Sequence, residues 1–164
     1  MITCSFKGWP SVSLRHVTCN ALVVRDNKIL LAKRSGTAIS EPDKYCLPGG
    51  FMDQDETLVE CVLRELQEET GYTGKVIALF SINDNVHRSP ARLDRQNIDM
   101  GFLIEVGEKT VDHDHEISEV SWFELEAIDK LEIAFDHKDV INAYKRYWEK
   151  PFLLPIISYK EIIK

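Results

Sequence analysis

The segment 49–72, GGFMDQDETLVECVLRELQEETGY, constrains the fold of this chain most strongly, because it predicts a single helix with crowded negative charge. The Gly49–Gly50 pair is typical of a turn, Asp55 fits the N-cap position, and Gly71 fits the residue that follows a helix. No glycine or proline interrupts residues 57–70, so the pattern predicts one continuous helix over them.

Glutamates are concentrated in this segment, at Glu56, Glu60, Glu65, Glu68 and Glu69. At about 100° per residue, the last three fall within roughly 100° of arc on the predicted helix. Each like-charge pair on adjacent turns costs roughly 0.2–0.5 kcal/mol, and the helix dipole disfavours anions near the C-terminus. The adjoining apolar stripe is predicted to face the core, and it consists of Val59, Val62, Leu63 and Leu66.

A helix gains no stability from this arrangement, whereas a site for a hard divalent cation does, because Mg²⁺ takes oxygen ligands and neutralises the carboxylates. A solvated acidic face is the alternative interpretation of any glutamate-rich helix. The residues around the glutamates favour the metal site, because they form a longer pattern with fixed spacing.

That pattern is Gly50, five residues, Glu56, seven residues and then RELQEETGY over residues 64–72. It resembles the Nudix box at every defining position: Gly, Glu, Arg-Glu, an aliphatic residue, Glu-Glu, Gly and a closing hydrophobic residue. The likeness extends more loosely from about Leu14 to Trp148.

The resemblance implies an enzyme that hydrolyses a nucleoside diphosphate linked to another group, with Mg²⁺ or Mn²⁺ as its cofactor. It also implies that Arg64 pairs with Glu56 and that this pair orients the helix carboxylates. The implied metal ligands are the Gly49 carbonyl, Glu65, Glu68 and Glu69.

Two candidates remain open for the general base. Glu65 takes that role in some members of the family that the box resembles. Glu116 lies in an acidic loop, residues 112–116, in a region from which such members often draw a glutamate. The same loop holds His113 and His115, which would suit a transition metal, and an exposed solvated loop is the alternative.

Substrate contacts are expected outside the box, in segment 83–96, because it is long for a connection between strands and is basic in an acidic protein. Arg88, Arg92 and Arg95 suit bidentate contacts to phosphate, or else they balance nearby aspartates. Phe80 would stack on a base, with core packing as its alternative.

Segment 83–96 loosely resembles the corresponding part of ADP-ribose and nucleotide-sugar diphosphatases, which favours ADP-ribose or a sugar nucleotide as the substrate. The alternatives are a house-cleaning nucleoside triphosphate pyrophosphohydrolase and a non-catalytic nucleotide-sensing domain. A decapping enzyme fits less well, because a net charge of −7 argues against stable binding of nucleic acid or of an anionic membrane.

The cysteines at positions 4, 19, 46 and 61 form no Cys-x-x-Cys motif, so reduced and partly buried thiols are expected, as in a cytoplasmic protein. The first ten residues lack the apolar stretch of a signal peptide. No apolar run approaches the ~20 residues of a membrane span, so no membrane contact is expected.

Apolar alternation and residue preference predict strands over residues 16–24, 28–33, 75–82, 97–106 and 119–125. The first two read as a hairpin about Asp26 and Asn27, and residues 136–148 read as an amphipathic helix. Strands flanking one helix, followed by a late helix, predict an α/β/α sandwich with a mixed sheet.

One domain is expected over residues 1–164, with an N-terminal extension over about 1–13 and a C-terminal tail over about 151–164. Trp9 in the extension is expected to pack on the core or at an interface. The tail, rich in isoleucine and leucine, either packs on the domain or mediates a homodimer, and the sequence leaves both open.

Overall fold

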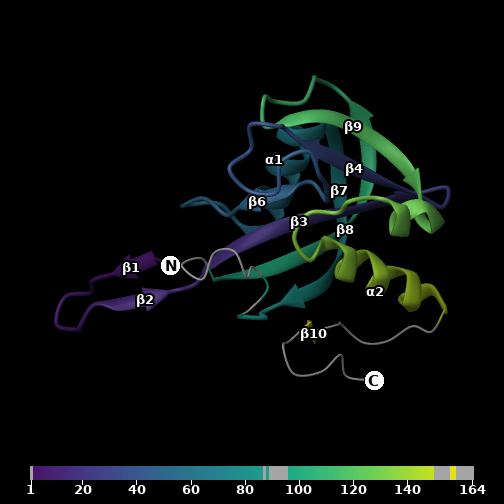
Figure 1. Cartoon of the computed structure of the whole chain (residues 1–164). Helices are drawn as coiled ribbons and strands as arrows, with labels where there is room; N and C mark the ends of the chain where they lie inside the picture. Colours follow the sequence, from purple (N-terminus) through teal and green to yellow (C-terminus); the bar gives the residue numbers. More distant parts are fainter. Residues whose placement is uncertain (1, 87, 89–95, 150–155, 158–164) are drawn as a thin grey trace.

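The computed structural model describes residues 2–86, 88, 96–149 and 156–157. Two α-helices lie on opposite sides of a mixed sheet (Figure 1). The elements in chain order are β1 (Ile2–Cys4), β2 (Val12–Leu14), β3 (His16–Arg25), β4 (Lys28–Arg34), β5 (Tyr45–Cys46), β6 (Gly49–Phe51), α1 (Leu58–Thr70), β7 (Tyr72–Asn83), β8 (Asn97–Lys109), β9 (Ile117–Glu124), the 3₁₀ helix η1 (Leu125–Lys130), α2 (His137–Glu149) and β10 (Ile156–Ile157).

Strand β3 is at the centre of the sheet, whose order is β10-β7-β8-β3-β4-β5. It pairs in parallel with β8, with Thr18 opposite Asp99, and antiparallel with β6, with Asn20 opposite Gly49. Strand β9 pairs with β4. The sheet therefore places the turn before α1 and β8 on the two edges of the same residues of β3, although about 50 residues of chain separate them.

The predicted hairpin between β3 and β4 is confirmed. Asp26 and Asn27 join the strands with φ of 51° and 61°. A two-residue turn with both central residues at positive φ matches the twist of the flanking strands, and asparagine and aspartate tolerate it best.

Helix α1 begins at a different cap from the predicted one. Thr57 is the N-cap and forms a capping box with Glu60, so the prediction of Asp55 as the cap is wrong. The predicted end is confirmed: Gly71 has φ of 77°, and its N–H donates to the Gln67 carbonyl at 2.8 Å. A Cβ at Gly71 would lie 1.9 Å from the Val111 carbonyl oxygen, so glycine is required twice over.

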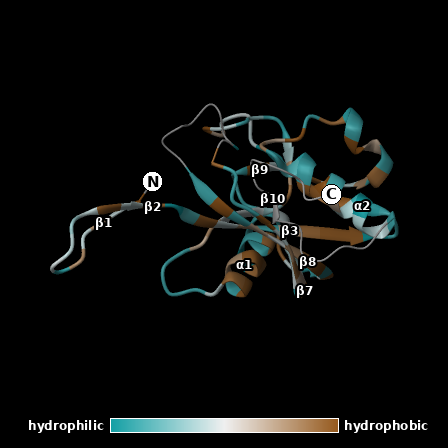
Figure 2. Cartoon of the chain, turned by 90° about the horizontal axis from the view of Figure 1, so that it is seen from below, coloured by the Kyte–Doolittle hydropathy of each residue, from teal (hydrophilic) through white to brown (hydrophobic). Residues whose placement is uncertain are grey.

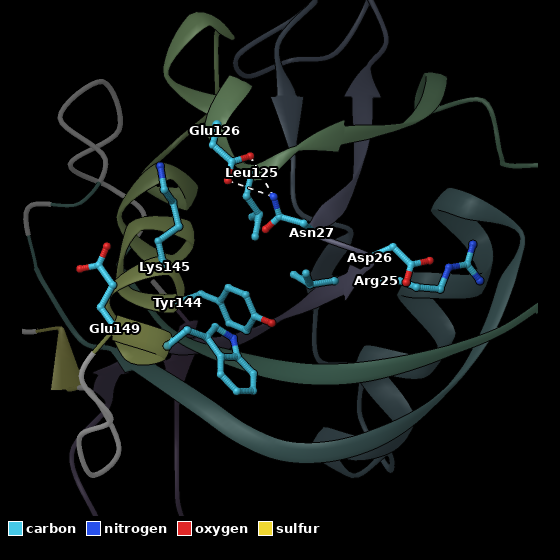
Figure 3. Close-up of a pocket in the computed structure, with 10 residues that line it drawn as sticks. Arg25, Asp26, Asn27, Leu125, Glu126, Tyr144, Lys145 and Glu149 are labelled. Atoms are coloured by element: carbon cyan, nitrogen blue, oxygen red, sulfur yellow. Dashed lines mark hydrogen bonds between the residues drawn. The ribbon is translucent and has the colours of Figure 1, made fainter.

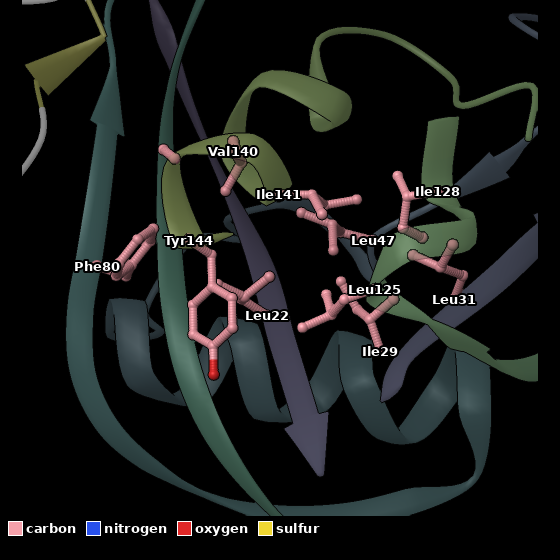
Figure 4. Close-up of a cluster of buried hydrophobic side chains, with 11 residues drawn as sticks. Leu22, Ile29, Leu31, Leu47, Phe80, Leu125, Ile128, Val140, Ile141 and Tyr144 are labelled. Carbon is pink, nitrogen blue, oxygen red and sulfur yellow. The ribbon is translucent and has the colours of Figure 1, made fainter. Parts of the chain in front are cut away.

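Each face of the sheet carries its own hydrophobic cluster, which confirms the α/β/α sandwich. Side chains alternate along β3, as the period of a strand requires. On one face β3 meets α1 through Cys19, Ala21, Val23, Cys61, Val62 and Leu66. On the other it meets α2 through Leu22, Val140, Ile141 and Tyr144 (Figure 4). Of the predicted apolar stripe on α1, Val59 does not belong to the core, since it is 44% exposed.

The brown, hydrophobic residues of β3 lie between the two helices (Figure 2). Strands β1 and β2 form a separate hairpin that projects away from this body (Figures 1 and 2). Trp9 in that hairpin is 74% exposed, so the prediction that it packs on the core is wrong.

In the tail, residues 156–157 pair in parallel with Ile82 and Asn83 of β7, and the rest of the predicted tail lies outside the described residues. Cys19, Cys46 and Cys61 are buried with free thiols, as expected. Across the part of the chain that the structure describes, no helix is long and apolar enough to cross a membrane.

Candidate active site

A cavity of about 230 Å³, here called the box cavity, opens where the start of β3 meets α1 and the start of α2. Glu65 and Glu69 of α1 line it, with Gly49 of β6 and Glu116 of the loop before β9. Thr18, Asn20, Asp99, Arg88 and His137 also line it. Four of the predicted site residues on or beside the acidic helix therefore share one space with residues of the sheet.

Arg64 connects the glutamates of the box into one network. Its Nη2 donates to Glu56 Oε1 at 2.8 Å and its Nε to Glu56 Oε2 at 3.1 Å, so the expected pair is present in bidentate form. Its Nη1 donates to Glu65 at 2.8 Å and to Glu68 at 3.0 Å. The Arg64 guanidinium holds the pKa of Glu56 at about 2, well below its usual range.

Glu69 is buried, with 5% of its surface exposed, and its Oε2 accepts the Gly49 N–H at 2.8 Å. Burial raises the pKa of Glu69 to about 8, with a further contribution from the charge of Glu65. Burial likewise raises the pKa of Glu65. Two carboxylates that resist ionisation are thus held side by side at the cavity wall.

Gly50 is required by this packing. A Cβ at that position would lie 2.5 Å from Glu65 Oε1, so any side chain would displace the carboxylate. The lack of a side chain at Gly50 therefore leaves the space that the Glu65 carboxylate occupies.

The donor set fits a hard divalent cation, although Arg64 now occupies oxygens of Glu65 and Glu68. Among the described residues, no three His, Cys, Asp or Glu side chains are arranged as a closed metal cluster. A cation would neutralise Glu65 and Glu69, and Glu68, whose side chain is half exposed and bound by Arg64, would complete the donor set. Carboxylate oxygens are the ligands that Mg²⁺ and Mn²⁺ prefer.

The loop that carries Glu116 is fixed to α1. The Asp114 N–H donates to the Glu68 carbonyl at 2.8 Å, and the Glu116 N–H donates to Asp114 Oδ1 at 2.9 Å. These contacts place Glu116 on the box cavity. His113 and His115 are not among its lining residues.

Of the predicted substrate residues that the structure describes, one lies at the box cavity and one does not. Arg88 lines the box cavity, with its guanidinium bound by Asp136 through Nε at 2.8 Å and Nη2 at 2.6 Å. Arg92 and Arg95 lie outside the described residues. The prediction that Phe80 stacks on a base is wrong, because Phe80 is 7% exposed and packs edge-on against Tyr144 and Tyr147 in the core.

Sequence reasoning missed the polar residues on the sheet side of the box cavity. Asp99 Oδ1 accepts from Thr18 Oγ1 at 2.7 Å and from Asn20 Nδ2 at 2.6 Å, and all three are buried or partly buried. The available signal was the occurrence of polar residues at core-facing positions in the otherwise apolar runs HVTCNALVV and NIDMGFLIEV.

His137 begins α2 and was also missed. Its Nδ1 accepts the Leu47 N–H at 3.0 Å, and burial lowers the pKa of His137 to about 4. The ring is therefore neutral at physiological pH, and with Nδ1 as acceptor the proton is assigned to Nε2.

A second and larger cavity, of about 430 Å³, lies at the opposite end of β3 and is here called the hairpin cavity. The β3–β4 turn, the start of η1 and the last turns of α2 enclose it (Figure 3). Two of its polar residues bind each other: Asn27 Nδ2 donates to both carboxylate oxygens of Glu126, at 2.9 and 3.0 Å. None of the predicted site residues lines it.

Comparison with known proteins places these features in a family. A family model described as NUDIX domain matches residues 14–144. The ADP-ribose pyrophosphatase of Methanocaldococcus jannaschii is 37% identical over 134 residues, which cover 80% of this chain and 73% of that protein. The ADPR responsive transcriptional repressor NtrR of Acinetobacter baylyi is 30% identical over 147 residues, covering 82% of this chain and 57% of the repressor.

A solved structure shows the same architecture. The NUDIX domain of Shewanella oneidensis NrtR complexed with ADP ribose superposes with a TM-score of 0.70 at 26% identity, covering 84% of this chain and 90% of that one.

Proposed function

The chain belongs to the NUDIX family, and on that premise we propose that it hydrolyses the diphosphate bond of a nucleoside diphosphate linked to another moiety. The observation that carries the proposal is the pair of buried Glu69 and partly buried Glu65, held at the wall of the box cavity and connected to Glu68 and Glu56 through Arg64. A fold without this chemistry would gain nothing from burying two neighbouring carboxylates.

In the proposed enzyme Glu65, Glu68, Glu69 and the Gly49 carbonyl hold Mg²⁺ or Mn²⁺. The cation supplies charge neutralisation for the diphosphate and lowers the pKa of water. Arg64 orients the three carboxylates, and Glu56 in turn fixes Arg64. Glu65 or Glu116, which line the same cavity, takes the proton of the attacking water.

ADP-ribose or a nucleotide sugar is the substrate class we propose. The support is the 37% identity to a protein named as an ADP-ribose pyrophosphatase and the similarity to a NUDIX domain solved with ADP ribose. Small nucleotides are the expected partners, and the buried free thiols support a cytoplasmic location.

The test is a turnover screen with Mg²⁺ and with Mn²⁺ over ADP-ribose, UDP-sugars, dinucleoside polyphosphates, NADH and nucleoside triphosphates. We expect metal-dependent release of AMP from ADP-ribose, or of a nucleoside monophosphate from a sugar nucleotide. Turnover of triphosphates alone would contradict the substrate class and would indicate a triphosphate pyrophosphohydrolase.

A nucleotide-sensing role is the second candidate, because a relative that matches 82% of this chain is named as an ADPR responsive repressor. The two functions differ in one observable. A sensor binds ADP-ribose without consuming it, so binding by calorimetry with no product in either metal would favour the sensor.

A further inference from the structure

The sheet side of the box cavity holds two buried polar atoms that the proposed chemistry does not use. Asp99 is 1% exposed, and while its Oδ1 accepts from Thr18 and Asn20, its Oδ2 has no hydrogen-bond partner among the described residues. Arg88 Nε and Nη2 bind Asp136, while Nη1 has no hydrogen-bond partner within the described part of the chain.

These two atoms belong to neighbouring side chains. Arg88 Nη1 is 3.8 Å from the other carboxylate oxygen of Asp99, Oδ1, and both side chains line the box cavity. Buried polar groups are nearly always paired, because leaving one unpaired forfeits its bonds to water without replacement. An acceptor and a donor left side by side at a cavity wall therefore indicate a bound group that both donates and accepts.

The charges around the pair decide which kind of group fits. The Arg88 guanidinium lies between two carboxylates, Asp136 at 2.6 Å and Asp99 at 3.8 Å. Burial raises the pKa of Asp99, while the Arg88 guanidinium and the hydrogen bonds from Thr18 and Asn20 favour its charged form. One cation against two anions repels a phosphate, whereas a hydroxyl carries no charge, donates to Asp99 and accepts from Arg88.

We propose that Asp99 Oδ2 and Arg88 Nη1 bind a hydroxyl group of a neutral sugar, so that this end of the box cavity recognises the sugar attached to the diphosphate. The inference rests on the proposed function, since the diphosphate itself would lie against Glu65 and Glu69, which line the same cavity. It also assigns the choice of substrate to residues outside the box: a triphosphate would bring its terminal charge to a wall with net negative charge.

A nucleobase edge also combines a donor with an acceptor, but the surroundings suit it less. The side chains next to Asp99 on this wall are polar, and Asn97 Nδ2 donates to Thr18 Oγ1 at 2.6 Å. A base needs apolar or aromatic faces, and the phenylalanines of the cavity, Phe51 and Phe135, are 48% and 41% exposed, at its rim.

The kinetic test compares wild type with Asp99→Asn, which keeps the shape of the side chain and removes its charge. With Mg²⁺ and ADP-ribose we expect KM to rise about tenfold to a hundredfold with kcat changed by less than about threefold, because the lost bond is charge-assisted and distant from the reacting phosphorus. Asp129→Asn is the matched control, as the same change at an exposed position beside Lys138.

A binding test separates the inference from the proposed function. Calorimetry with Mg²⁺ would measure ribose 5-phosphate, inorganic phosphate and adenosine on wild type and on Asp99→Asn. We expect ribose 5-phosphate alone to lose about tenfold or more in affinity. If no substrate is hydrolysed but this loss is found, the sugar site stands and the proposed function fails.

Three results would overturn the inference: unchanged KM and unchanged ribose 5-phosphate binding in Asp99→Asn, a loss confined to adenosine, or an equal loss for inorganic phosphate. Thermal unfolding of each variant identifies misfolding. If Asp99→Asn is unstable, Arg88→Met repeats the binding comparison from the other side of the pair, with the same expected loss for ribose 5-phosphate and the same overturning outcomes.

Discussion

The two cavities at the ends of β3 differ in how their polar groups are paired. The hairpin cavity is the larger, at about 430 Å³, and two of its polar side chains, Asn27 and Glu126, bind each other. The box cavity, at about 230 Å³, is lined by buried carboxylates and by polar atoms without partners among the described residues. Unpaired buried charge is costly to maintain, so it marks a functional site more reliably than volume does.

Removing one buried carboxylate of the box cavity should cause the largest loss of kcat. Glu69→Gln keeps the shape of the side chain but removes the charge proposed to bind the metal. Since a metal stabilises transition-state charge by several kcal/mol, we expect kcat to fall by about 10³-fold or more. Steady-state kinetics with Mg²⁺ measures this, with circular dichroism as the control for folding. Near wild-type turnover would contradict the site.

A smaller loss should follow from altering the residue that orients the carboxylates. Arg64→Lys keeps the charge but loses the planar guanidinium that binds both oxygens of Glu56 while donating to Glu65 and Glu68, so we expect kcat to fall about 10- to 100-fold. Arg25→Lys, at the hairpin cavity, is the matched control and should change kcat by less than about twofold. Equal effects in the two variants would remove the distinction between the cavities.

His137 should make the stability of the protein depend on pH. Burial holds its folded-state pKa at about 4, near Asp136, Arg88 and Arg34, against an ordinary value of 6.5. Between these values the unfolded chain binds a proton that the folded chain does not. Stability contributed by the neutral ring is therefore complete above pH 6.5 and is lost as pH falls towards 4, by about 3 kcal/mol.

Urea unfolding at several pH values, on wild type and His137→Gln, measures this contribution. The variant should show a shallower fall in the free energy of unfolding between pH 6.5 and 4. Equal slopes in the two proteins would contradict the burial of a neutral ring.

The smallest effect is expected at the hairpin cavity itself. Trp148 lines it and is 65% exposed, so Trp148→Ala should change kcat and KM for ADP-ribose by less than about twofold. The same kinetic assay decides. A loss comparable to that of Arg64→Lys would show that the larger cavity takes part in turnover.

Local spacing explains which parts of the site could be predicted from the sequence. Glu65, Glu68, Glu69 and Arg64 lie on one helix, where the positions of side chains follow from the number of residues between them. The start of that helix was harder to predict than its end, because Asp55 and Thr57 are both acceptable caps. Only Thr57 has the partner Glu60 three residues on.

Pairing between distant strands explains what could not be predicted. Asp99 meets Thr18 across 81 residues of sequence, in a register that strand patterns alone do not specify. Phe80 lies where β7 shifts register against β8, between Leu79 and Ser81, and such a shift changes the face that each residue presents.

The parallel pairing of β3 with β8 also determines when the protein becomes competent during synthesis. A nascent chain that has just completed α1 already holds the box glutamates and Arg64, but Asp99, Glu116 and His137, which line the same cavity, have not yet been translated. Contacts this far apart in sequence form late in folding, because the chain between them must first be ordered. Protection of arrested chains from protease by ADP-ribose, measured on chains extended by a C-terminal linker, should therefore begin only at linker lengths that place α2 outside the ribosome, and its onset would time the last step of folding.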